Sequence, residues 1–480
     1  MTNINSHWSV CLLCEGNGKT RLKPSKKKRQ QYRRKVIKYE NNNQIGTAPK
    51  PPKGDFHYCL NCLGSGLKAT KKVTLPTNKN FPRIAIIGAG ISGVALAVAC
   101  LHRGIPFTLY ERDMHFNSRL QGYGLTLQQA SNAIKCFGIQ HLKDAVISTR
   151  HIVHKPDGTV IGEWGFRKWE PTKKKKPTKR TNIHIPRQSL RFALFEQLGG
   201  DEFVSWGHRL TNIQENENKS IQLTFDVKGT PHYSEADLVV GADGIRSSLR
   251  QFLINDETSP LRFLNCMVIL GICELSELNN LKSHLLDSAT VFQTANGHER
   301  IYMMPFNKNA IMWQLSFPMK ELDALSLSNC GAKALKKEAI LRTQWHSPIP
   351  EIVMSTKENK ITGYPIYDRD LLKPEWLKKS KNATLIGDAA HPMSPFKGQG
   401  ANQALLDSLA LAKAIYKECK NSSQWKEKGL RKYILSEFEL EMIQRSSRKV
   451  SDSANAIANL HSNEILIESD TTRGSGKKIR

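Results

Sequence analysis

The chain has 480 residues, 39% of them hydrophobic, so it can bury a sizeable core and has room for two or three domains. Its 32 glycines and 21 prolines are too few for a collagen-like or low-complexity chain, and its ten cysteines are too few for a disulfide-rich secreted scaffold. The net charge of +28 favours acidic partners such as nucleic acid, phosphates or an anionic surface, but it says nothing about the fold.

The first 80 residues form a separate basic segment. They contain 17 Lys and Arg against three acids, which supplies half of the net charge of the chain. Residues 26–34 read KKKRQQYRR, and a Lys/Thr/Asn linker over 70–80 closes the segment. Apolar residues are too sparse here for a conventional core, so something else must fold the segment or it is disordered.

Two cysteine motifs with the pattern CxxCxGxG lie in this segment, at 11–18 and 59–66. Two thiolates two residues apart form a knuckle around one metal ion, and the glycines let backbone N–H groups point at sulfur. Each motif resembles a repeat of the cysteine-rich zinc domain of DnaJ-type chaperones, and two repeats imply one structural zinc ion, whose binding would supply folding energy. A redox CxxC pair is the alternative. The expected zinc ligands are Cys11, Cys14, Cys59 and Cys62.

The basic run between the motifs has three interpretations: a nucleic-acid-binding segment, a nuclear-localisation signal (a nuclear address), or a solvated arm. The sequence contains no RNA-reading or DNA-reading motif, so an arm or address is favoured over specific recognition of nucleic acid. The first ten residues lack a basic region followed by an apolar core, so no secretory signal is expected. These features predict a cytoplasmic or nuclear protein that is not secreted.

From Phe81 onward the sequence is typical of α/β structure. A strand at 83–87, a helix at 92–103 and a strand at 107–111 predict a βαβ unit with a glycine turn after the first strand. The run from Ile84 to Leu101 carries no charge, but its glycine spacing indicates a nucleotide-binding turn, so no membrane span is expected.

The turn reads GAGISG, a GxGxxG motif between a strand and a helix. Gly88 permits the tight turn, Gly90 lets the backbone approach a pyrophosphate, and Gly93 allows close packing of helix and strand. The helix N-terminus presents free N–H groups to the phosphates, and Glu111 ends the second strand where it can accept hydrogen bonds from the adenosine ribose. Nicotinamide and flavin dinucleotides share this fingerprint, so it predicts a dinucleotide without choosing between them.

The later elements are separated by loops, which include a charged insertion, PTKKKKPTKR, that we interpret as solvated. Short strands with aromatic residues alternate with loops over about 260–370, as is typical of an antiparallel sheet. In chain order we expect a helix at 189–198, a strand at 236–240, the antiparallel sheet at about 260–370, a strand at 383–386, and helices at 401–419 and 425–460.

Two further motifs follow predicted strands. Residues 236–250 read ADLVVGADGIRSSLR, and residues 384–402 read TLIGDAAHPMSPFKGQGAN. With the GxGxxG turn, in this order and spacing, they make the chain resemble the single-component FAD-dependent aromatic monooxygenases of the para-hydroxybenzoate hydroxylase type, which include the tetracycline-inactivating flavoenzymes. The resemblance covers roughly 82–420. It implies an α/β fold with a Rossmann-like FAD-binding domain and an antiparallel-sheet substrate domain, beside the small zinc-binding segment.

The resemblance implies a discontinuous domain arrangement. Because the nucleotide fold begins only at Phe81, removal of the first 80 residues is expected to leave FAD binding intact. The expected parts are the basic zinc-knuckle segment and linker at 1–80, the FAD-binding domain at 81–146, 182–255 and 375–460, the substrate domain at 147–181 and 256–374, and a disordered tail at 461–480.

The resemblance also assigns cofactor contacts to individual residues. Arg112 is expected beside the adenine, Arg119 near the cofactor, and Arg187 at the ribityl region. Asp243 belongs to an Asp-Gly motif that serves FAD and the transient NAD(P)H, and Asp388 is expected at the ribityl hydroxyls or the pyrophosphate. The full implied set is Gly88, Gly90, Gly93, Glu111, Arg112, Arg119, Arg187, Asp243, Asp388, Pro395, Gly398, Gly400 and Ala401.

The segment at 398–401 has a physical role of its own. Its two glycines let main-chain N–H groups approach the edge of the flavin, and the helix that begins there directs its positive end at the pyrimidine ring. This end would stabilise the negative charge of reduced flavin, whereas the alternative is a glycine-containing helix cap.

No side chain stands out as a general base, so no catalytic residue is predicted, and His391 is given no required acid–base role. The resemblance implies that a flavin C4a-hydroperoxide delivers oxygen to a small aromatic or polycyclic substrate, with NAD(P)H as reductant, while the protein excludes water. Tyr302, Phe306 and Trp313 are either cavity lining or core. Two alternatives stay open: a flavoprotein reductase or dehydrogenase on the same fold, and a zinc or basic-arm binding protein with an idle flavin domain.

Overall fold

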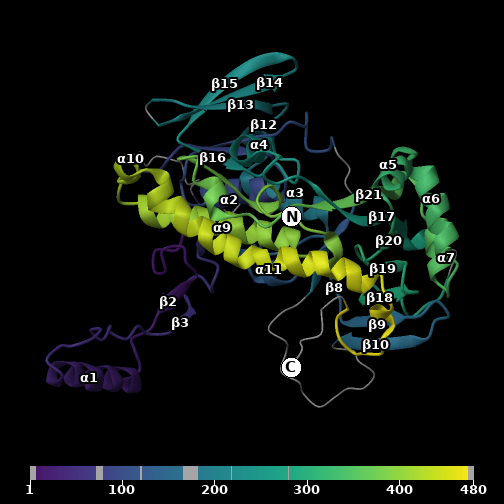
Figure 1. Cartoon of the computed structure of the whole chain (residues 1–480), viewed down its shortest axis with the longest axis horizontal. Helices are drawn as coiled ribbons and strands as arrows, with labels where there is room; N and C mark the ends of the chain where they lie inside the picture. Colours follow the sequence, from purple (N-terminus) through teal and green to yellow (C-terminus); the bar gives the residue numbers. More distant parts are fainter. Residues whose placement is uncertain are drawn as a thin grey trace.

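The computed structural model describes residues 7–71, 79–118, 122–165, 182–217, 219–278 and 281–473. Figure 1 shows an N-terminal module that rests on the body at one end and projects from it at the other, a central part built around long helices, and a sheet flanked by shorter helices on the opposite side of the molecule. Within the described ranges, no helix is both long enough and apolar enough to cross a membrane.

The N-terminal module consists of two antiparallel strand pairs and one helix. β1 pairs with β4, so that the two ends of the module meet, and β2 pairs with β3. The helix α1 begins after Ser25, whose Oγ accepts a hydrogen bond from the Lys28 N–H, and it buries no residue. The elements are β1 His7–Val10, β2 Lys19–Arg21, α1 Lys26–Asn41, β3 Phe56–Tyr58 and β4 Leu67–Thr70.

The central part is a parallel five-stranded sheet with the strand order β12-β6-β5-β16-β22. The order reverses beside β5, which is where open α/β sheets bind ligands, outside the carboxyl ends of the strands. Helices α2 and α9 pack against each other beside this sheet. The strands are β5 Ile84–Ile87, β6 Phe107–Tyr110, β12 Val204–Ser205, β16 Leu238–Gly241 and β22 Ala383–Leu385, and the helices are α2 Ile91–Leu101, α3 Arg187–Leu198, α4 Ser248–Ile254, α8 Pro374–Leu377, α9 Gly400–Cys419, α10 Trp425–Lys428 and α11 Ser436–Leu460.

The other large sheet has seven strands in the order β10-β9-β18-β19-β20-β17-β21, antiparallel except for the β9–β18 pair. One face packs under α5–α7, and the other face packs against Phe396 and Ile457 of the central part. The strands are β9 Arg150–His154, β10 Val160–Gly165, β17 Arg262–Glu274, β18 Thr290–Ala295, β19 Arg300–Pro305, β20 Ala310–Pro318 and β21 Ile361–Asp368, and the helices are α5 Glu321–Asn329, α6 Gly331–Arg342 and α7 Ile349–Ser355.

Two small antiparallel sheets complete the fold, in the orders β7-β11-β8 and β13-β14-β15. The first carries β11 directly into α3, so it positions the start of that helix beside the nucleotide turn. The strands are β7 Gly124–Leu127, β8 Val146–Ile147, β11 Ile183–Pro186, β13 Arg209–Glu215, β14 Ile221–Val227 and β15 Thr230–Ala236.

The structure differs from the sequence-based prediction in three places. Helices α5–α7 lie inside the region where only strands were expected. The helix expected at 425–460 is interrupted at Gly429, whose φ of +80° separates α10 from the turn that leads into α11. The tail was expected to be disordered from residue 461, yet Ser469 N–H donates to the Ile161 carbonyl, so this part packs on β10. The charged insertion at 171–180 lies outside the described residues.

Candidate functional site

The glycine turn between β5 and α2 has the geometry that phosphate binding requires. Gly88 has a φ of +101°, and a Cβ there would lie 2.8 Å from the Ala242 carbonyl oxygen. A Cβ on Gly93 would lie 1.8 Å from the Gly88 carbonyl oxygen, so the helix and the turn touch at this point. At Gly90, by contrast, a Cβ would meet no atom nearer than 4.0 Å, and α2 has no side-chain cap. The free space and the free N–H groups together form a cradle for a phosphate.

Glu111 lies beside this turn, just past the end of β6. Its Oε2 accepts a hydrogen bond from the Ala89 N–H at 2.7 Å, and its Oε1 accepts one from the Asp113 N–H at 3.0 Å. The carboxylate therefore supports the turn and remains only partly buried. Arg112 is exposed next to it, and Arg119 lies outside the described residues.

Asp243 lies on the other side of the turn, after β16. Its Cα is 2.8 Å from the position that a Cβ on Gly88 would take. Its Oδ2 accepts a hydrogen bond from the Leu249 N–H at 3.3 Å, whereas its buried Oδ1 has no partner within the described chain. Burial raises the pKa of this carboxyl. A buried oxygen without a donor fits a position where a bound ligand supplies one.

A second helix N-terminus reaches the same region. Gly398, with a φ of +58°, follows a turn that begins at Pro395, and α9 starts at Gly400 without a side-chain cap. Asp388 faces this start, since its Oδ1 is 3.4 Å from where a Cβ on Gly400 would stand. Ala401 is the next residue of α9 and is partly buried.

Asp388 and Arg187 lie close enough for their charges to interact. Burial raises the pKa of Asp388, against the charges of His391 and Arg187, which lower it. The Asp388 side chain is nevertheless accessible to solvent. The Arg187 guanidinium lies 5.6 Å from the centre of the Tyr123 ring. The structure thus brings together residues that the sequence predicted from three separate motifs.

Asn402 fixes the start of α9, although the sequence analysis gave it no role. This fully buried side chain donates through Nδ2 to the Gly398 carbonyl at 2.8 Å and to the Thr126 carbonyl at 2.9 Å. Its Oδ1 accepts from the Gln128 N–H at 2.8 Å and from the Ala130 N–H at 3.0 Å. The only signal in the sequence was its place at the end of the GQGAN motif.

A buried ion-pair network holds the Asp388 loop. Asp407 of α9 accepts hydrogen bonds from the Gly387 N–H at 2.9 Å, from His391 Nε2 at 2.7 Å and from Arg445 at 2.9 Å. Burial alone would lower the pKa of His391, but Asp407 raises it. Burial alone would raise the pKa of Asp407, but His391 and Arg445 lower it. His391 therefore serves as a structural partner of Asp407.

A family profile described as "FAD binding domain" matches residues 82–433. The chain belongs to this FAD-binding family. A probable FAD-dependent monooxygenase of Arthroderma benhamiae is 27% identical over 409 residues, which cover 79% of this chain and 92% of the relative. The 3-amino-4-hydroxybenzoate 2-monooxygenase PtmB3 of Streptomyces platensis is 28% identical over 351 residues, which cover 70% of this chain and 80% of the relative.

A solved structure, 2,6-dihydroxypyridine-3-hydroxylase from Arthrobacter nicotinovorans, superimposes with a TM-score of 0.64 at 18% identity, covering 82% of this chain and 94% of that one. The likeness shows the fold. Together with the family match, it confirms the predicted para-hydroxybenzoate hydroxylase type of fold and the predicted enzyme class. The protein is an FAD-dependent monooxygenase. The matched profile begins after the cysteine module, which is therefore an addition to the flavin-binding part.

One face of the seven-stranded sheet of the monooxygenase packs against Phe396, in the segment 395–401 that the sequence predicts to contact the flavin. Tyr302 of β19 and Phe306 belong to a cluster on this face that includes Phe396, next to the glycines that precede α9. Trp313 points to the opposite face, where it is fully buried and its Nε1 donates to Thr356 Oγ1 at 2.9 Å. Trp313 is therefore core, whereas Tyr302 and Phe306 lie on the sheet face that packs against Phe396.

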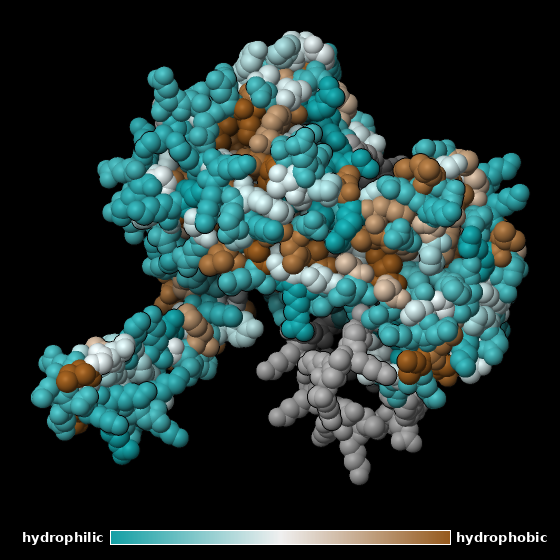
Figure 2. All heavy atoms as spheres, in the orientation of Figure 1, coloured by the Kyte–Doolittle hydropathy of each residue, from teal (hydrophilic) through white to brown (hydrophobic). Residues whose placement is uncertain are grey.

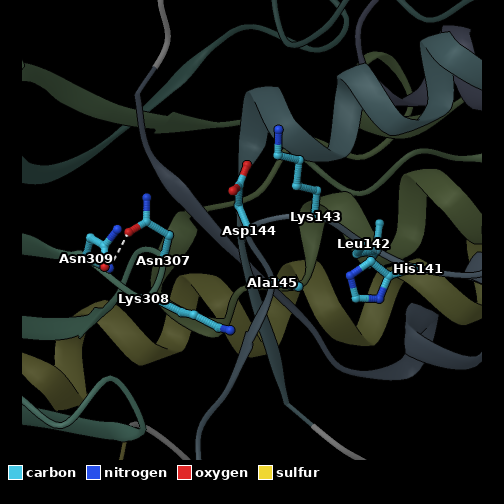
Figure 3. A pocket seen from close by; sticks show the side chains of 8 residues that line it. All are labelled: His141, Leu142, Lys143, Asp144, Ala145, Asn307, Lys308 and Asn309. Atoms are coloured by element: carbon cyan, nitrogen blue, oxygen red, sulfur yellow. Dashed lines mark hydrogen bonds between the residues drawn. The ribbon is translucent and has the colours of Figure 1, made fainter. Parts of the chain in front are cut away.

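A separate surface hollow of about 360 Å³ is formed by the loop before β8 and the turn between β19 and β20 (Figure 3). In the turn, the Asn309 N–H donates to the Asn307 side chain at 2.8 Å. None of the predicted cofactor residues lines this hollow. The hollow is therefore lined by a different set of residues from the predicted cofactor site.

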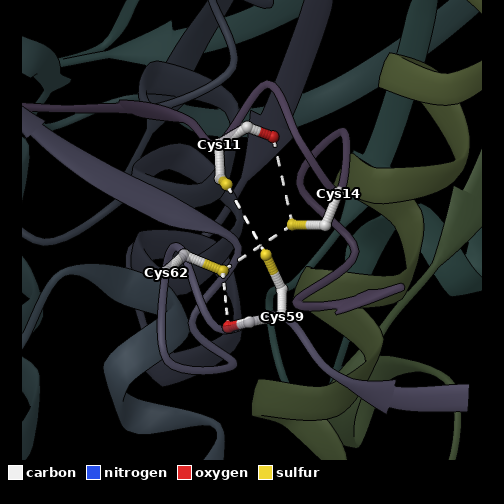
Figure 4. A group of neighbouring side chains, drawn as sticks. All are labelled: Cys11, Cys14, Cys59 and Cys62. Atoms are coloured by element: carbon white, nitrogen blue, oxygen red, sulfur yellow. Dashed lines mark hydrogen bonds between the residues drawn. The ribbon is translucent and has the colours of Figure 1, made fainter.

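The four cysteines predicted as metal ligands converge on one point (Figure 4). All four are buried, they form no disulfide, and their Sγ atoms lie within 4.8 Å of one another. The Sγ atoms of Cys11 and Cys59 are 3.9 Å apart, and those of Cys14 and Cys62 are 3.7 Å apart. Four sulfurs at roughly 2.3 Å from a tetrahedral zinc ion have separations of this size.

Backbone N–H groups point at the sulfurs as the glycine spacing predicted. The Gly18 N–H donates to Cys14 Sγ at 3.3 Å, and the Gly66 N–H donates to Cys62 Sγ at 3.2 Å. Both glycines have positive φ, and a Cβ on Gly18 would lie 2.2 Å from the Gly64 carbonyl oxygen. The two knuckles therefore pack directly on each other, and their donor set fits a small structural zinc site.

Proposed function

We propose that this FAD-dependent monooxygenase hydroxylates a small aromatic or polycyclic substrate, with NAD(P)H as reductant and O2 as oxidant. The observation that carries the proposal is a contact between two parts of the chain. Phe396, in the segment 395–401 that we expect to bind the flavin, packs against a face of the seven-stranded sheet that carries aromatic side chains. Tyr123, Tyr302 and Phe396 pack in one cluster there, and Tyr123 also lies beside Arg187. Apolar and aromatic surface next to a few polar groups is typical of a site for a small ring substrate. PtmB3, whose name gives an aminohydroxybenzoate as substrate, supports this class.

We assign the cofactor contacts as follows. The N–H groups at the start of α2, with Gly90, bind the pyrophosphate, and Glu111 binds the adenosine ribose. Arg187 and Asp388 bind the ribityl side, and the N-terminus of α9 at Gly400 stabilises negative charge on the flavin ring. FAD, when bound, supplies the redox chemistry, namely hydride acceptance and oxygen activation.

The residues of the chain position the substrate and exclude water, and none is assigned as a general base. Burial raises the pKa of Tyr302 to about 12 and also raises the pKa of Tyr123. Both phenols therefore stay protonated at neutral pH, so they can donate hydrogen bonds to a substrate oxygen. A role in orientation follows for both.

The test is turnover of the purified, FAD-loaded protein with NADH or NADPH over a panel of phenols and aminobenzoates. We expect reduction that is faster with a true substrate, consumption of O2, and a product heavier by one oxygen atom in mass spectrometry. Reduction of the flavin with no consumption of O2 and no oxygenated product from any panel compound would contradict the proposed hydroxylation. A flavin that neither nucleotide reduces with any panel compound would contradict NAD(P)H as the reductant for this class of substrate.

We also propose that the cysteine cluster binds one structural zinc ion. Four buried sulfurs at tetrahedral separations, each knuckle with a backbone donor, support this proposal. Metal analysis of the full-length protein should give about one zinc per chain, and Cys59→Ser with Cys62→Ser should abolish it. Retention of zinc by the double variant would show that other residues bind the metal, whereas a reversible disulfide within one knuckle and no zinc would support the redox alternative.

A third proposal concerns α1, which we assign to binding of nucleic acid through its phosphates. The helix carries eight basic residues and one acid, buries none of its side chains, and projects from the body (Figures 1 and 2). Phe56 and Tyr58 of the adjacent strand pair are 59% and 68% exposed, and Arg21 covers the Phe56 ring at 4.2 Å. Exposed aromatic rings among cations provide stacking as well as charge.

Fluorescence anisotropy with a labelled single-stranded oligonucleotide tests this proposal. We expect binding whose logarithmic affinity falls linearly with the logarithm of the salt concentration. Replacement of Arg29, Arg33 and Arg34 by Gln should reduce the steepness of that salt dependence. Equal affinity of wild type and triple variant would contradict it.

A further inference from the structure

The cysteine module is docked on the two helices that also form the flavin site. α2 begins at the phosphate-binding turn and is followed at its other end by Arg103, while α9 begins at the flavin segment and ends near Lys420. Lys420 Nζ lies 2.7 Å from Glu15 Oε2 in the first knuckle. Trp8 of β1 covers Gly138, where a Cβ would lie 2.5 Å from the indole ring. The module therefore contacts the ends of α2 and α9 that lie farthest from the cofactor.

Arg103 is enclosed at this junction. Its side chain is 3% exposed, and its Nη1 donates to the Ala99 carbonyl at 2.9 Å. Its Nε and Nη2 are buried and have no hydrogen-bond partner among the residues that the structure describes. Nη2 is 3.9 Å from the position of a Cβ on Gly16, inside the first knuckle. A buried guanidinium with unused donors is destabilising unless an anion lies nearby.

Among the residues that the structure describes, no carboxylate forms a hydrogen bond with Arg103. Burial lowers the pKa of Arg103, and the groups that oppose this effect are thiols and a phenol, with Cys14 among them. Lys413 of α9 has a similar environment, since burial lowers its pKa and the opposing groups are Cys136 and Cys14. Arg103 and Lys19 lie near enough to Lys413 to lower its pKa further. The junction therefore concentrates positive charge beside the cysteine cluster.

Metal binding changes the charge of the cluster. Four protonated thiols are neutral, whereas four thiolates around one divalent zinc ion carry a net charge of −2. We propose that the metal-loaded cysteine centre is the counter-ion of Arg103, and that metal loading thereby stabilises α2 and α9 and tightens FAD binding. This inference rests on the zinc proposal made above.

The coupling follows from thermodynamic linkage. The docked module and the FAD site share α2, an 11-residue helix about 16 Å long. If the metal favours the docked arrangement and the docked arrangement favours FAD, then FAD must in turn favour retention of the metal by the same factor. The cysteine module thus acts as a metal-dependent clamp: when it holds zinc, it stabilises the ends of α2 and α9 that lie farthest from the FAD site, and it thereby favours FAD binding.

The first test uses the full-length protein and a strong chelator, which leaves the thiols intact. Zinc content, melting temperature and the dissociation constant for FAD are measured before chelation, after chelation and after return of zinc. We expect removal of zinc to lower the melting temperature by several degrees and to weaken FAD binding by roughly tenfold, as loss of charged hydrogen bonds does, with both effects reversed by zinc. We also expect saturating FAD to slow zinc release.

The second test asks whether Arg103 carries the effect. Arg103→Met removes the charge at similar length, Arg103→Lys keeps it, and Arg33→Met, at an exposed position of α1, is the matched control for charge. In Arg103→Met the zinc-dependent gain in melting temperature should fall by at least half, because the stripped protein no longer holds an unpaired cation. Arg103→Lys and Arg33→Met should keep most of the gain.

The outcomes separate the two proposals. If the protein never binds zinc, the zinc proposal fails. If it binds zinc but loaded and stripped proteins have equal melting temperatures and equal affinities for FAD, the zinc proposal stands and the clamp is overturned. An undiminished zinc-dependent gain in Arg103→Met would also overturn it.

Discussion

Gly90 is the residue at which a substitution should weaken FAD binding without affecting the stability of the fold. Its φ is −73° and a Cβ would meet no close atom, so Gly90→Val should fold with a melting temperature near that of wild type. Its side chain would occupy the space of the pyrophosphate, and we expect FAD affinity to fall at least tenfold, which is about 1.4 kcal/mol. Flavin fluorescence titration measures the affinity. Gly93→Val is the control, because its Cβ would lie 1.8 Å from the Gly88 carbonyl oxygen and should impair folding itself.

The Asp407–His391 pair predicts a pH window for stability. The pKa of His391 is raised, so its contribution is complete below about pH 6.5 and is lost as pH rises through the raised value. The pKa of Asp407 is lowered, so its contribution is complete above about pH 3.9 and is lost as pH falls through the lowered value. Asp407→Asn should therefore cost most between these limits, about 3–5 kcal/mol because it leaves a buried charge unpaired.

Denaturant unfolding of wild type and Asp407→Asn at a series of pH values measures this difference. We expect a maximum in mildly acidic solution and a decrease on both sides. A difference that does not change with pH would contradict the assignment of opposite charges to the pair.

At the scale of elements, α9 depends on one amide for the position of its first turn. Asn402→Ala would leave the N–H groups of Gln128 and Ala130 without an acceptor and would release the Gly398 carbonyl. We expect a loss of about 2–4 kcal/mol in the free energy of unfolding, together with weaker FAD binding. Asn402→Asp, which keeps the acceptor and loses the donor, should retain part of the stability. Equal unfolding curves for the alanine variant and wild type would show that the amide does not hold the turn.

At the scale of the whole molecule, the docking of the module changes the expectation for truncation. The sequence predicts that removal of residues 1–80 leaves FAD binding intact, because the nucleotide fold begins at Phe81. In the structure, truncation would uncover Arg103 and the Gly138 surface and would remove the ion pair to Lys420. We therefore expect a folded, yellow protein with a lower melting temperature and weaker FAD binding than the full chain. Affinity for FAD equal to that of the full chain would support the original expectation.

The sequence by itself determined the local chemistry. The GxGxxG turn, the two later motifs and the paired CxxCxGxG knuckles depend on residue type and on short spacing, so they identified the family, the central strands and helices, and the four cysteines. Backbone demands such as the positive φ of Gly88, and donors such as the Gly18 N–H, act over a few residues and are therefore visible in a linear pattern. The pattern of strands and loops over 260–370 was also a local signal, but it did not reveal the helices α5–α7. Their apolar side chains pack against the seven-stranded sheet, and this contact is not visible in the sequence.

Only the tertiary structure decided which side chains from distant segments of the chain contact one another. Asn402 gave no signal of its role in the sequence, because its partners lie in and just after β7, far from it in the chain. The charge of His391 likewise depends on Asp407 in α9 and Arg445 in α11. The environment of Arg103 depends on a module that ends more than 30 residues earlier in the chain. Burial and ion pairing depend on which residues lie close together in three dimensions, and residues far apart in one sequence give no local pattern that shows this.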